Sequence, residues 1–181
     1  MWTRKRLASR EPEMAASDRT IRIRHELKPG DLGMVVHLHG VIYAREYGLD
    51  TSFEPYVAKP LVDCVLDGTG RVWIAEDADR IVGSIAMVDA GEGIGQLRWF
   101  LLVPEVRGIG LGRRLLEAAL AYGRERGFLR IFLWTFADLE GARRLYERAG
   151  FRVTETKTGL IWGAERTEVR MEMELGAAGG R

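Results

Sequence analysis

The 181-residue sequence lacks paired cysteines, a long hydrophobic run and an excess of charge of either sign. The single cysteine, Cys64, cannot form a disulfide within the chain, which favours a reducing compartment. Because no apolar run approaches the ~20 residues of a membrane span, and the N-terminus lacks the apolar segment of a signal peptide, we expect a cytoplasmic protein with no membrane partner. The net charge of +1 argues against nucleic acid as a partner.

Hydrophobic residues make up 46% of the chain, enough for a sizeable core in a single domain. Residues 1–19 show no periodicity and mix charges of both signs, so a flexible N-terminal tail is expected there. Residues 176–181 are rich in glycine and alanine and are expected to fray. The folded domain is therefore expected over residues 20–175.

Apolar residues recur with the periods typical of strands and helices, separated by turn residues. Strands are predicted over residues 20–25, 71–77, 81–89, 95–103, 129–135, 151–157 and 165–175. Helices are predicted over residues 31–47, 52–66, 111–126 and 139–149, with Asp31 as the N-cap of the first. This order, β-α-α-β-β-β-α-β-α-β-β, predicts a mixed α/β fold class with a central mixed sheet flanked by helices.

A glycine-rich turn, with Gly108, Gly110 and Gly112, joins a buried strand to a strongly periodic helix. Glycines let the backbone approach a bulky group, and the first N–H groups of a helix have no partner within it. Together with the helix dipole and the nearby arginines, these groups favour a phosphate or pyrophosphate. The P-loop pattern GxxxxGK[ST] and the dinucleotide pattern GxGxxG are both absent.

The spacing R-x-x-G-x-G, here Arg107, Gly110 and Gly112, resembles the acetyl-coenzyme A (acetyl-CoA) pyrophosphate loop of the GNAT superfamily of N-acetyltransferases. The same letters alone would also fit an ordinary strand–turn–helix junction, but the predicted order of elements is that of the GNAT fold. The resemblance implies that the pyrophosphate binds the backbone of Arg107, Gly108, Ile109, Gly110, Leu111, Gly112 and Arg113. It also implies that the pantetheine arm pairs with the backbone of Leu101, Leu102 and Val103.

A second segment, from Ala142 to Phe151, resembles the A-x-x-L-Y-x-x-x-G-F pattern of the same superfamily. The resemblance implies that Tyr146 faces the thioester sulfur and acts as the general acid that protonates the departing thiolate. The alternative is a core aromatic residue at helix spacing. Many relatives carry an asparagine that contacts the cofactor where this chain has Leu139, so that contact is not expected here.

The proton acceptor and the substrate contacts are less defined. The catalytic glutamate of some relatives corresponds to Gln96, which cannot accept a proton. Acidic and aromatic residues cluster between residues 43 and 56 and would suit a cationic amine, although a solvated acidic edge or deprotonation through ordered water fits equally. His37 and His39 face opposite ways on a helix, so no metal site is predicted. The candidate substrate contacts are Tyr43, Glu46, Tyr47, Glu54, Gln96, Arg98 and Trp162.

The predicted function is transfer of an acetyl group from acetyl-CoA to a small-molecule amine, by direct attack in a ternary complex. Two alternatives stay open: acetylation of a protein lysine or N-terminus, and a non-catalytic acyl-CoA sensor. Residues 38–50 and 97–100 more narrowly resemble the acetyltransferase half of bacterial MarR–GNAT fusion proteins. The chain has no room for a winged helix, so DNA binding is not carried over, and a homodimer is left open.

Overall fold

The computed structural model describes residues 20–176. The strands are β1 (Ile21–Arg24), β2 (Gly70–Asp77), β3 (Arg80–Asp89), β4 (Ile94–Leu102), β5 (Arg130–Phe136), β6 (Arg152–Ile161) and β7 (Ala164–Glu174). The helices are α1 (Asp31–Tyr47), α2 (Phe53–Leu66), α3 (Leu111–Glu125) and α4 (Glu140–Ala149). The predicted order of elements and the mixed α/β class are confirmed. The tails predicted over 1–19 and 176–181 lie outside the described residues, apart from Gly176.

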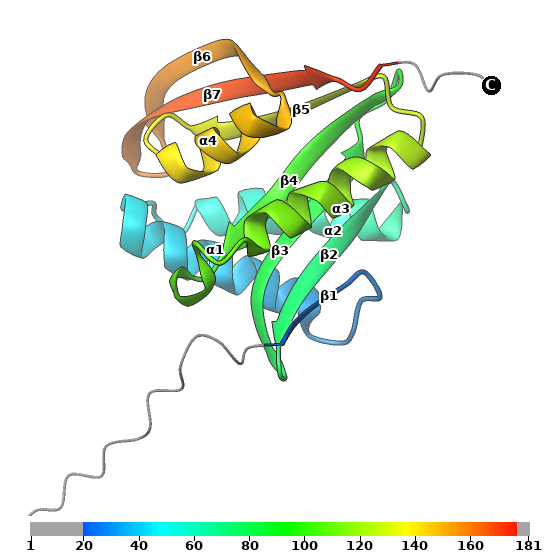
Figure 1. Cartoon of the computed structure of the whole chain (residues 1–181). Helices are drawn as coiled ribbons and strands as arrows, with labels where there is room; N and C mark the ends of the chain where they lie inside the picture. Colours follow the sequence, from blue (N-terminus) through cyan, green and yellow to red (C-terminus); the bar gives the residue numbers. More distant parts are fainter. Residues whose placement is uncertain (1–19, 177–181) are drawn as a thin grey trace, which may run out of the picture.

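The seven strands form one sheet in the order β1-β2-β3-β4-β5-β7-β6, and helices cover both of its faces. Neighbouring residues of β2 point to opposite faces: Trp73 packs in the cluster that contains Leu115 of α3, whereas Val72 and Ile74 pack with Leu61 of α2. Figure 1 shows α3 and α4 on the near side of the sheet and α2 on the far side. The hydrophobic core therefore has two layers, one on each face of the sheet.

The middle of the sheet opens between β4 and β5. These two strands run parallel, and in the described part of the chain they pair only where Ile94–Gln96 lie opposite Arg130–Phe132. Farther along, β4 carries a bulge at Trp99, which has a φ of 46° and accepts a 2.7 Å hydrogen bond from the Ser84 hydroxyl through its carbonyl oxygen. A bulge bends a strand and leaves backbone groups unpaired. The resulting opening positions the site described below.

Two boundaries differ from the sequence prediction in the last hairpin and the first helix. Strand β6 continues to Ile161, and Trp162 and Gly163 form a tight turn with φ values of 47° and 77°. The run of threonines and charged residues in β6 suits an exposed edge strand, so the strand is longer than its apolar pattern indicates. The N-cap of α1 is Gly30, not Asp31.

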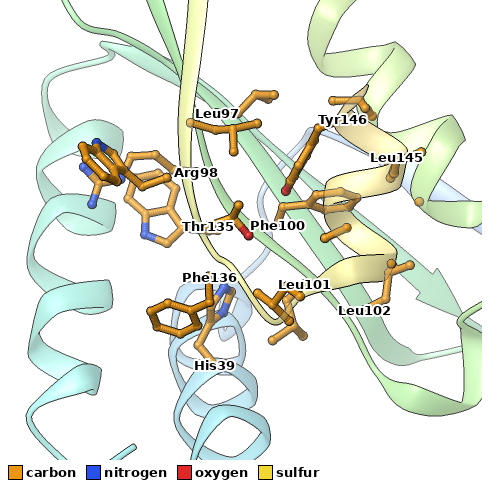
Figure 2. A pocket seen from close by; sticks show the side chains of 18 of the residues that line it. His39, Leu97, Arg98, Phe100, Leu101, Leu102, Thr135, Phe136, Leu145 and Tyr146 are labelled. Atoms are coloured by element: carbon orange, nitrogen blue, oxygen red, sulfur yellow. The ribbon is translucent and has the colours of Figure 1, made fainter. Parts of the chain in front are cut away.

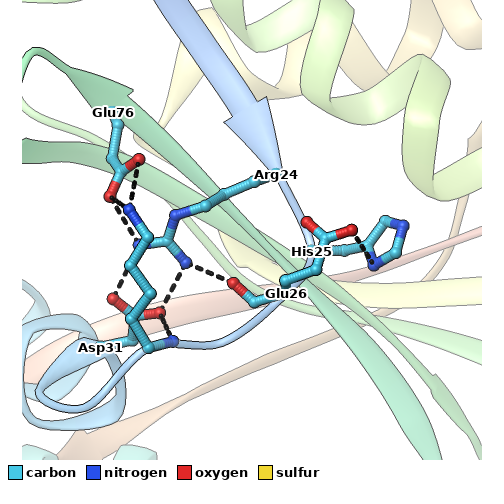
Figure 3. A network of polar contacts seen from close by, with 6 residues as sticks. Arg24, His25, Glu26, Asp31 and Glu76 are labelled. Carbon is cyan, nitrogen blue, oxygen red and sulfur yellow. Dashed lines mark hydrogen bonds and ion pairs between the residues drawn. The ribbon is translucent and has the colours of Figure 1, made fainter.

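Asp31 instead belongs to a buried polar network that joins β1, α1 and β2 (Figure 3). The Arg24 guanidinium donates to the Asp31 carboxylate at 2.6 and 2.8 Å and to the Glu76 carboxylate at 2.7 Å. Asp31 also accepts a hydrogen bond from the Lys28 backbone N–H. The prediction of an Asp31 cap was wrong because a buried arginine, seven residues earlier in the chain, takes up the carboxylate.

Candidate active site

A cavity of about 1370 Å³ lies where β4 and β5 separate. Its walls come from α1, α2, β4, the glycine-rich turn, α3, β5, α4 and β7, so it contacts both faces of the opened sheet. Figure 2 shows side chains of β4, β5 and α4 around this space. One continuous cavity therefore joins the glycine-rich turn to the aromatic residues of α1 and α2.

The glycine-rich turn presents free backbone donors. Gly108 and Gly110 have φ values of 80° and 85°, which side-chain-bearing residues rarely adopt, and α3 begins directly after Gly110. Within residues 20–176, the amide N–H groups from Gly108 to Arg113 donate to no protein acceptor. Gly108, Gly110, Gly112 and Arg113 line the cavity. Free amides at the positive end of a helix dipole form a binding site for an anion such as a phosphate.

Arg107 ties this turn to helix α1. Its Nε donates to the Leu102 carbonyl oxygen at 3.0 Å, and its Nη1 lies 3.0 Å from the Glu46 carboxylate. Glu46 lines the cavity as predicted for a substrate contact, but its charge is already compensated by Arg107. Its carboxylate is therefore already engaged by a cation of the protein.

Tyr146 of α4 is 5% exposed and packs against Phe100 and Phe151, with ring centroids 6.0 and 5.8 Å away. Figure 2 shows its hydroxyl pointing into the same space as the hydroxyl of Thr135. Among the described residues the Tyr146 hydroxyl makes no hydrogen bond, although the residue lines the cavity. Burial raises the pKa of this phenol above its usual value. The Tyr146 phenol is therefore protonated at neutral pH, and its O–H group is a hydrogen-bond donor that no described protein residue uses.

Aromatic side chains line the cavity next to helices α1 and α2. Trp162 of the β6–β7 turn lies 4.6 Å from Tyr56 and 5.0 Å from Phe53 between ring centroids, and Tyr43 lies 4.9 Å from Phe53. Burial, followed by Glu46, raises the pKa of Tyr47 to about 12. These residues form an apolar pocket with phenol groups that stay neutral near pH 7. The predicted contacts Tyr43, Tyr47 and Trp162 all line it.

His39 also lines the cavity, and the sequence did not indicate it as a contact. Burial lowers its pKa to about 4, and its Nδ1 lies 2.8 Å from the Val35 carbonyl oxygen. The imidazole is therefore neutral at physiological pH, and its Nδ1 is held by the backbone of its own helix. In the part of the chain that the structure describes, no three His, Cys, Asp or Glu residues lie close enough together to hold a metal ion.

Four of the predicted site residues do not line the cavity with their side chains. The Glu54 side chain instead packs against Gly40 of α1. A Cβ atom added at Gly40 would lie 2.5 Å from the Glu54 Oε1 atom. Val103 and Leu111 are core residues with 2% and 1% exposure, and Ile109 is 51% exposed on the outer surface of the turn. For Ile109 and Leu111 the predicted backbone contribution can apply, because their amides have no protein acceptor among the described residues. The Val103 N–H, by contrast, donates to the Val82 carbonyl oxygen at 2.9 Å, and the Val103 carbonyl oxygen accepts from the Val106 N–H at 3.2 Å.

Gln96 and Arg98 of β4 line the cavity, as do the predicted Leu101 and Leu102. A further polar residue there, Glu168 of β7, was missed. Its strand alternates apolar and polar residues, and several glutamates share the polar positions, so sequence pattern assigns a face but not the depth of each side chain. Burial raises the pKa of the Glu168 carboxyl above its usual value, partly offset by Lys157.

Comparison with known proteins identifies the family. The sequence pattern of the acetyltransferase (GNAT) family matches residues 37–151. The chain is 36% identical over 139 residues to YjgM, an uncharacterized N-acetyltransferase of Escherichia coli strain K12, and the match covers 73% of this chain and 83% of YjgM. The chain belongs to the GNAT acetyltransferase family. As a member it is an acyltransferase, and acetyl transfer from acetyl-CoA is general to the family.

Solved structures agree with this assignment. An acetyltransferase from Streptococcus agalactiae 2603 superposes with a TM-score of 0.71 at 26% identity, covering 86% of this chain and 98% of that one. YncA of Salmonella typhimurium, solved with its cofactor acetyl-CoA, has the same fold at 17% identity, with a TM-score of 0.70 over 86% of this chain and 94% of that one. Among residues 20–176 no helix of this GNAT protein is long and apolar enough to cross a membrane.

Proposed function

We propose that this GNAT protein transfers the acetyl group of acetyl-CoA to an amine of a small molecule, by direct attack within a ternary complex. The observation that carries the proposal is one continuous cavity that contains free amides at the glycine-rich turn, the unused Tyr146 hydroxyl and an aromatic pocket. The three features supply an anion site, a proton donor and a place for an acceptor. A pocket lined by several aromatic rings suits the apolar body of a small acceptor.

The backbone holds the cofactor in this proposal. The backbone from Arg107 to Arg113 binds the pyrophosphate, because the amides from Gly108 to Arg113 combine unused donors with the positive end of α3. The Arg107 amide itself donates to the Pro104 carbonyl oxygen at 3.2 Å. Of the predicted residues Leu101, Leu102 and Val103, the first two pair with the pantetheine arm at the edge of β4 that β5 leaves free. The Val103 N–H and carbonyl oxygen already bond to Val82 and Val106. Acetyl-CoA supplies the acyl group as a thioester, whose carbonyl carbon is the electrophile.

In this proposal Tyr146 is the general acid that protonates the leaving sulfur. An alkyl ammonium with a pKa near ~10 first loses a proton, and its nitrogen then attacks the thioester carbonyl. When the C–S bond breaks, the Tyr146 phenol donates its proton to the sulfur and regains one from the nitrogen of the new amide. No covalent enzyme intermediate is needed. Cys64 is 3% exposed, burial raises the pKa of its thiol, and it does not line the cavity.

Gly112→Asp is expected to weaken acetyl-CoA binding about tenfold or more, because it places a carboxylate beside the pyrophosphate at the start of α3. An added Cβ at Gly112 lies no closer than 3.4 Å to Leu102, Leu145 or Phe100, so the fold accommodates a small side chain. An acidic residue in the first turn also suits the helix dipole, so the melting temperature should not fall. Isothermal titration with acetyl-CoA measures the affinity.

Gly112→Asn is the matched control, because it has the same size without the charge. It should lose clearly less affinity than Gly112→Asp, and the difference should shrink at high salt. Equal affinities for both variants and the wild type would place the pyrophosphate elsewhere. Thiol release on mixing acetyl-CoA with a panel of small amines and a lysine peptide then tests transfer. Acetylation of the peptide alone would contradict a small acceptor.

A further inference from the structure

Arg98 presents an uncompensated positive charge to the acceptor pocket. Its guanidinium lies 5.0 Å from the ring centroid of Trp99 and 5.8 Å from that of Tyr56, and its one hydrogen bond is a long 3.5 Å contact with Gln96. Within the described chain no carboxylate lies within 4 Å of it. The half-buried Arg166 and Arg170, by contrast, each bind a carboxylate at 2.9 Å. Arg98 is thus a cation without an anionic partner.

Glu168 presents to the same pocket a negative charge that Lys157, its cross-strand neighbour on β6, offsets only in part. No residue between 20 and 176 donates a hydrogen bond to its carboxylate or forms an ion pair with it. The Lys157 ammonium lies 2.9 Å from Glu155 instead. On the same strand, Glu172 shows the ordinary arrangement, because it pairs with Arg130 and Arg170 at 3.5 and 2.9 Å. Glu168 is therefore an anion without a direct ion-pair partner among the described residues.

Both charges act on one aromatic residue of the pocket. Arg98, whose guanidinium lies 5.8 Å from the Tyr56 ring centroid, and Glu168 line the same cavity as Tyr56. Burial raises the pKa of the Tyr56 phenol, Arg98 lowers it and Glu168 raises it. Tyr56 in turn packs on Trp162 at 4.6 Å. A half-buried charge without a partner is destabilising, and a ligand with the opposite charge relieves that penalty. The pocket therefore combines one site for a cation, one for an anion, and an apolar wall.

We propose that the acceptor is an amino-carboxylate with an apolar or aromatic body, whose amino group binds Glu168 and whose carboxylate binds Arg98. The inference rests on the proposed function, since it assigns the occupant of the same pocket. A polyamine fits less well, because Arg98 would repel its second cation. Arg98 suits a carboxylate because a guanidinium can donate two parallel hydrogen bonds to it.

Glu168 then also accepts the first proton of the reaction. The bound ammonium transfers one proton to the Glu168 carboxylate, and the free nitrogen attacks the acetyl carbonyl. The second proton moves from nitrogen to sulfur through Tyr146, and Glu168 returns the first to solvent. Glu168 lines the cavity without a direct ion-pair partner, and burial raises the pKa of its carboxyl, which suits a proton acceptor.

The test uses ligands that share one body and differ in charge. L-phenylalanine and 4-(2-aminoethyl)benzoate carry both groups, 2-phenylethylamine lacks the carboxylate, and 3-phenylpropionate lacks the amine. Their dissociation constants are measured by titration into the full chain saturated with coenzyme A. At least one amino-carboxylate should bind about tenfold or more tightly than both single-charge ligands.

Two variants test which protein residue binds the carboxylate of the ligand and which binds its amino group. Arg98→Gln should abolish the preference over 2-phenylethylamine, and Glu168→Gln should abolish the preference over 3-phenylpropionate. Arg22→Gln and Glu174→Gln, which neutralise exposed residues, should preserve both preferences. The inference is overturned if the wild type shows no preference, or if either pocket variant weakens all four ligands equally. Coenzyme A binding by the same preparations reports separately on the proposed function.

Discussion

Tyr146→Phe is expected to lower kcat by ~10²–10⁴-fold, the range for loss of a general acid. The phenol is 5% exposed and makes no hydrogen bond within the described chain, so removing its oxygen leaves no protein group without a partner. Phenylalanine keeps the packing against Phe100 and Phe151. The dissociation constant of acetyl-CoA and the melting temperature should therefore change little. Steady-state kinetics with an accepted amine measures kcat, and titration of acetyl-CoA measures the dissociation constant. Thermal unfolding measures the melting temperature.

Tyr122→Phe is the matched control for this substitution. Tyr122 is also buried, at 9% exposure, and packs on Trp73, but it does not line the cavity. Its kcat should stay at the wild-type value. A Tyr146→Phe enzyme with unchanged kcat would remove the general-acid role. Because burial raises the pKa of Tyr146, the phenol stays protonated well above neutral pH, and a fall in wild-type kcat between pH 7 and 9 would also contradict the role.

The order of the strands and helices could be predicted because it depends on local periodicity. Alternating residues in β2 and the periodic apolar residues of α3 assign buried faces without knowledge of distant partners. Asp31 could not be placed in this way. A carboxylate at the start of a helix is an ordinary cap, and only the approach of Arg24 and of Glu76 on another strand takes it into the core.

In the candidate site, too, features that depend on consecutive residues could be predicted, and features that depend on distant residues could not. The glycine-rich turn was recognisable because its conformation and its free amides follow from a few consecutive residues, Gly108 to Arg113. The partner of Glu46 is Arg107, which lies 61 residues away in the chain, so its compensation was not visible in the sequence. Glu168 was missed for the same reason, since its burial depends on three elements that meet in space. The roles assigned to these residues stay predictions.

Arg24→Met is expected to destabilise the protein by about 3–5 kcal/mol, because it leaves the buried Asp31 carboxylate without its cation and the Glu76 carboxylate with Lys28 alone. Arg24 and Asp31 are each 4% exposed, and Glu76 is 8% exposed. Methionine fills a similar volume but offers no donor, so Asp31 and Glu76 would repel each other across β1. Urea unfolding at pH 7 measures the loss. Lys28→Met is the control, because the Lys28 side chain is 57% exposed and its pair with Glu76 is screened by water.

The pH dependence of the unfolding free energy provides a second test of the charge contribution of this network. The hydrogen bond from Arg24, followed by that from Lys28, lowers the pKa of Glu76 to about 2 from its ordinary 4.5. A lowered folded-state pKa means that this carboxylate stabilises the fold above pH 4.5 and that its contribution disappears as the pH falls toward about 2. Without Arg24 the pKa of Glu76 rises, so the difference in unfolding free energy between wild type and Arg24→Met should be largest at neutral pH and shrink toward pH 2. A difference that stays constant across this range would show that Arg24 contributes through packing, not through charge.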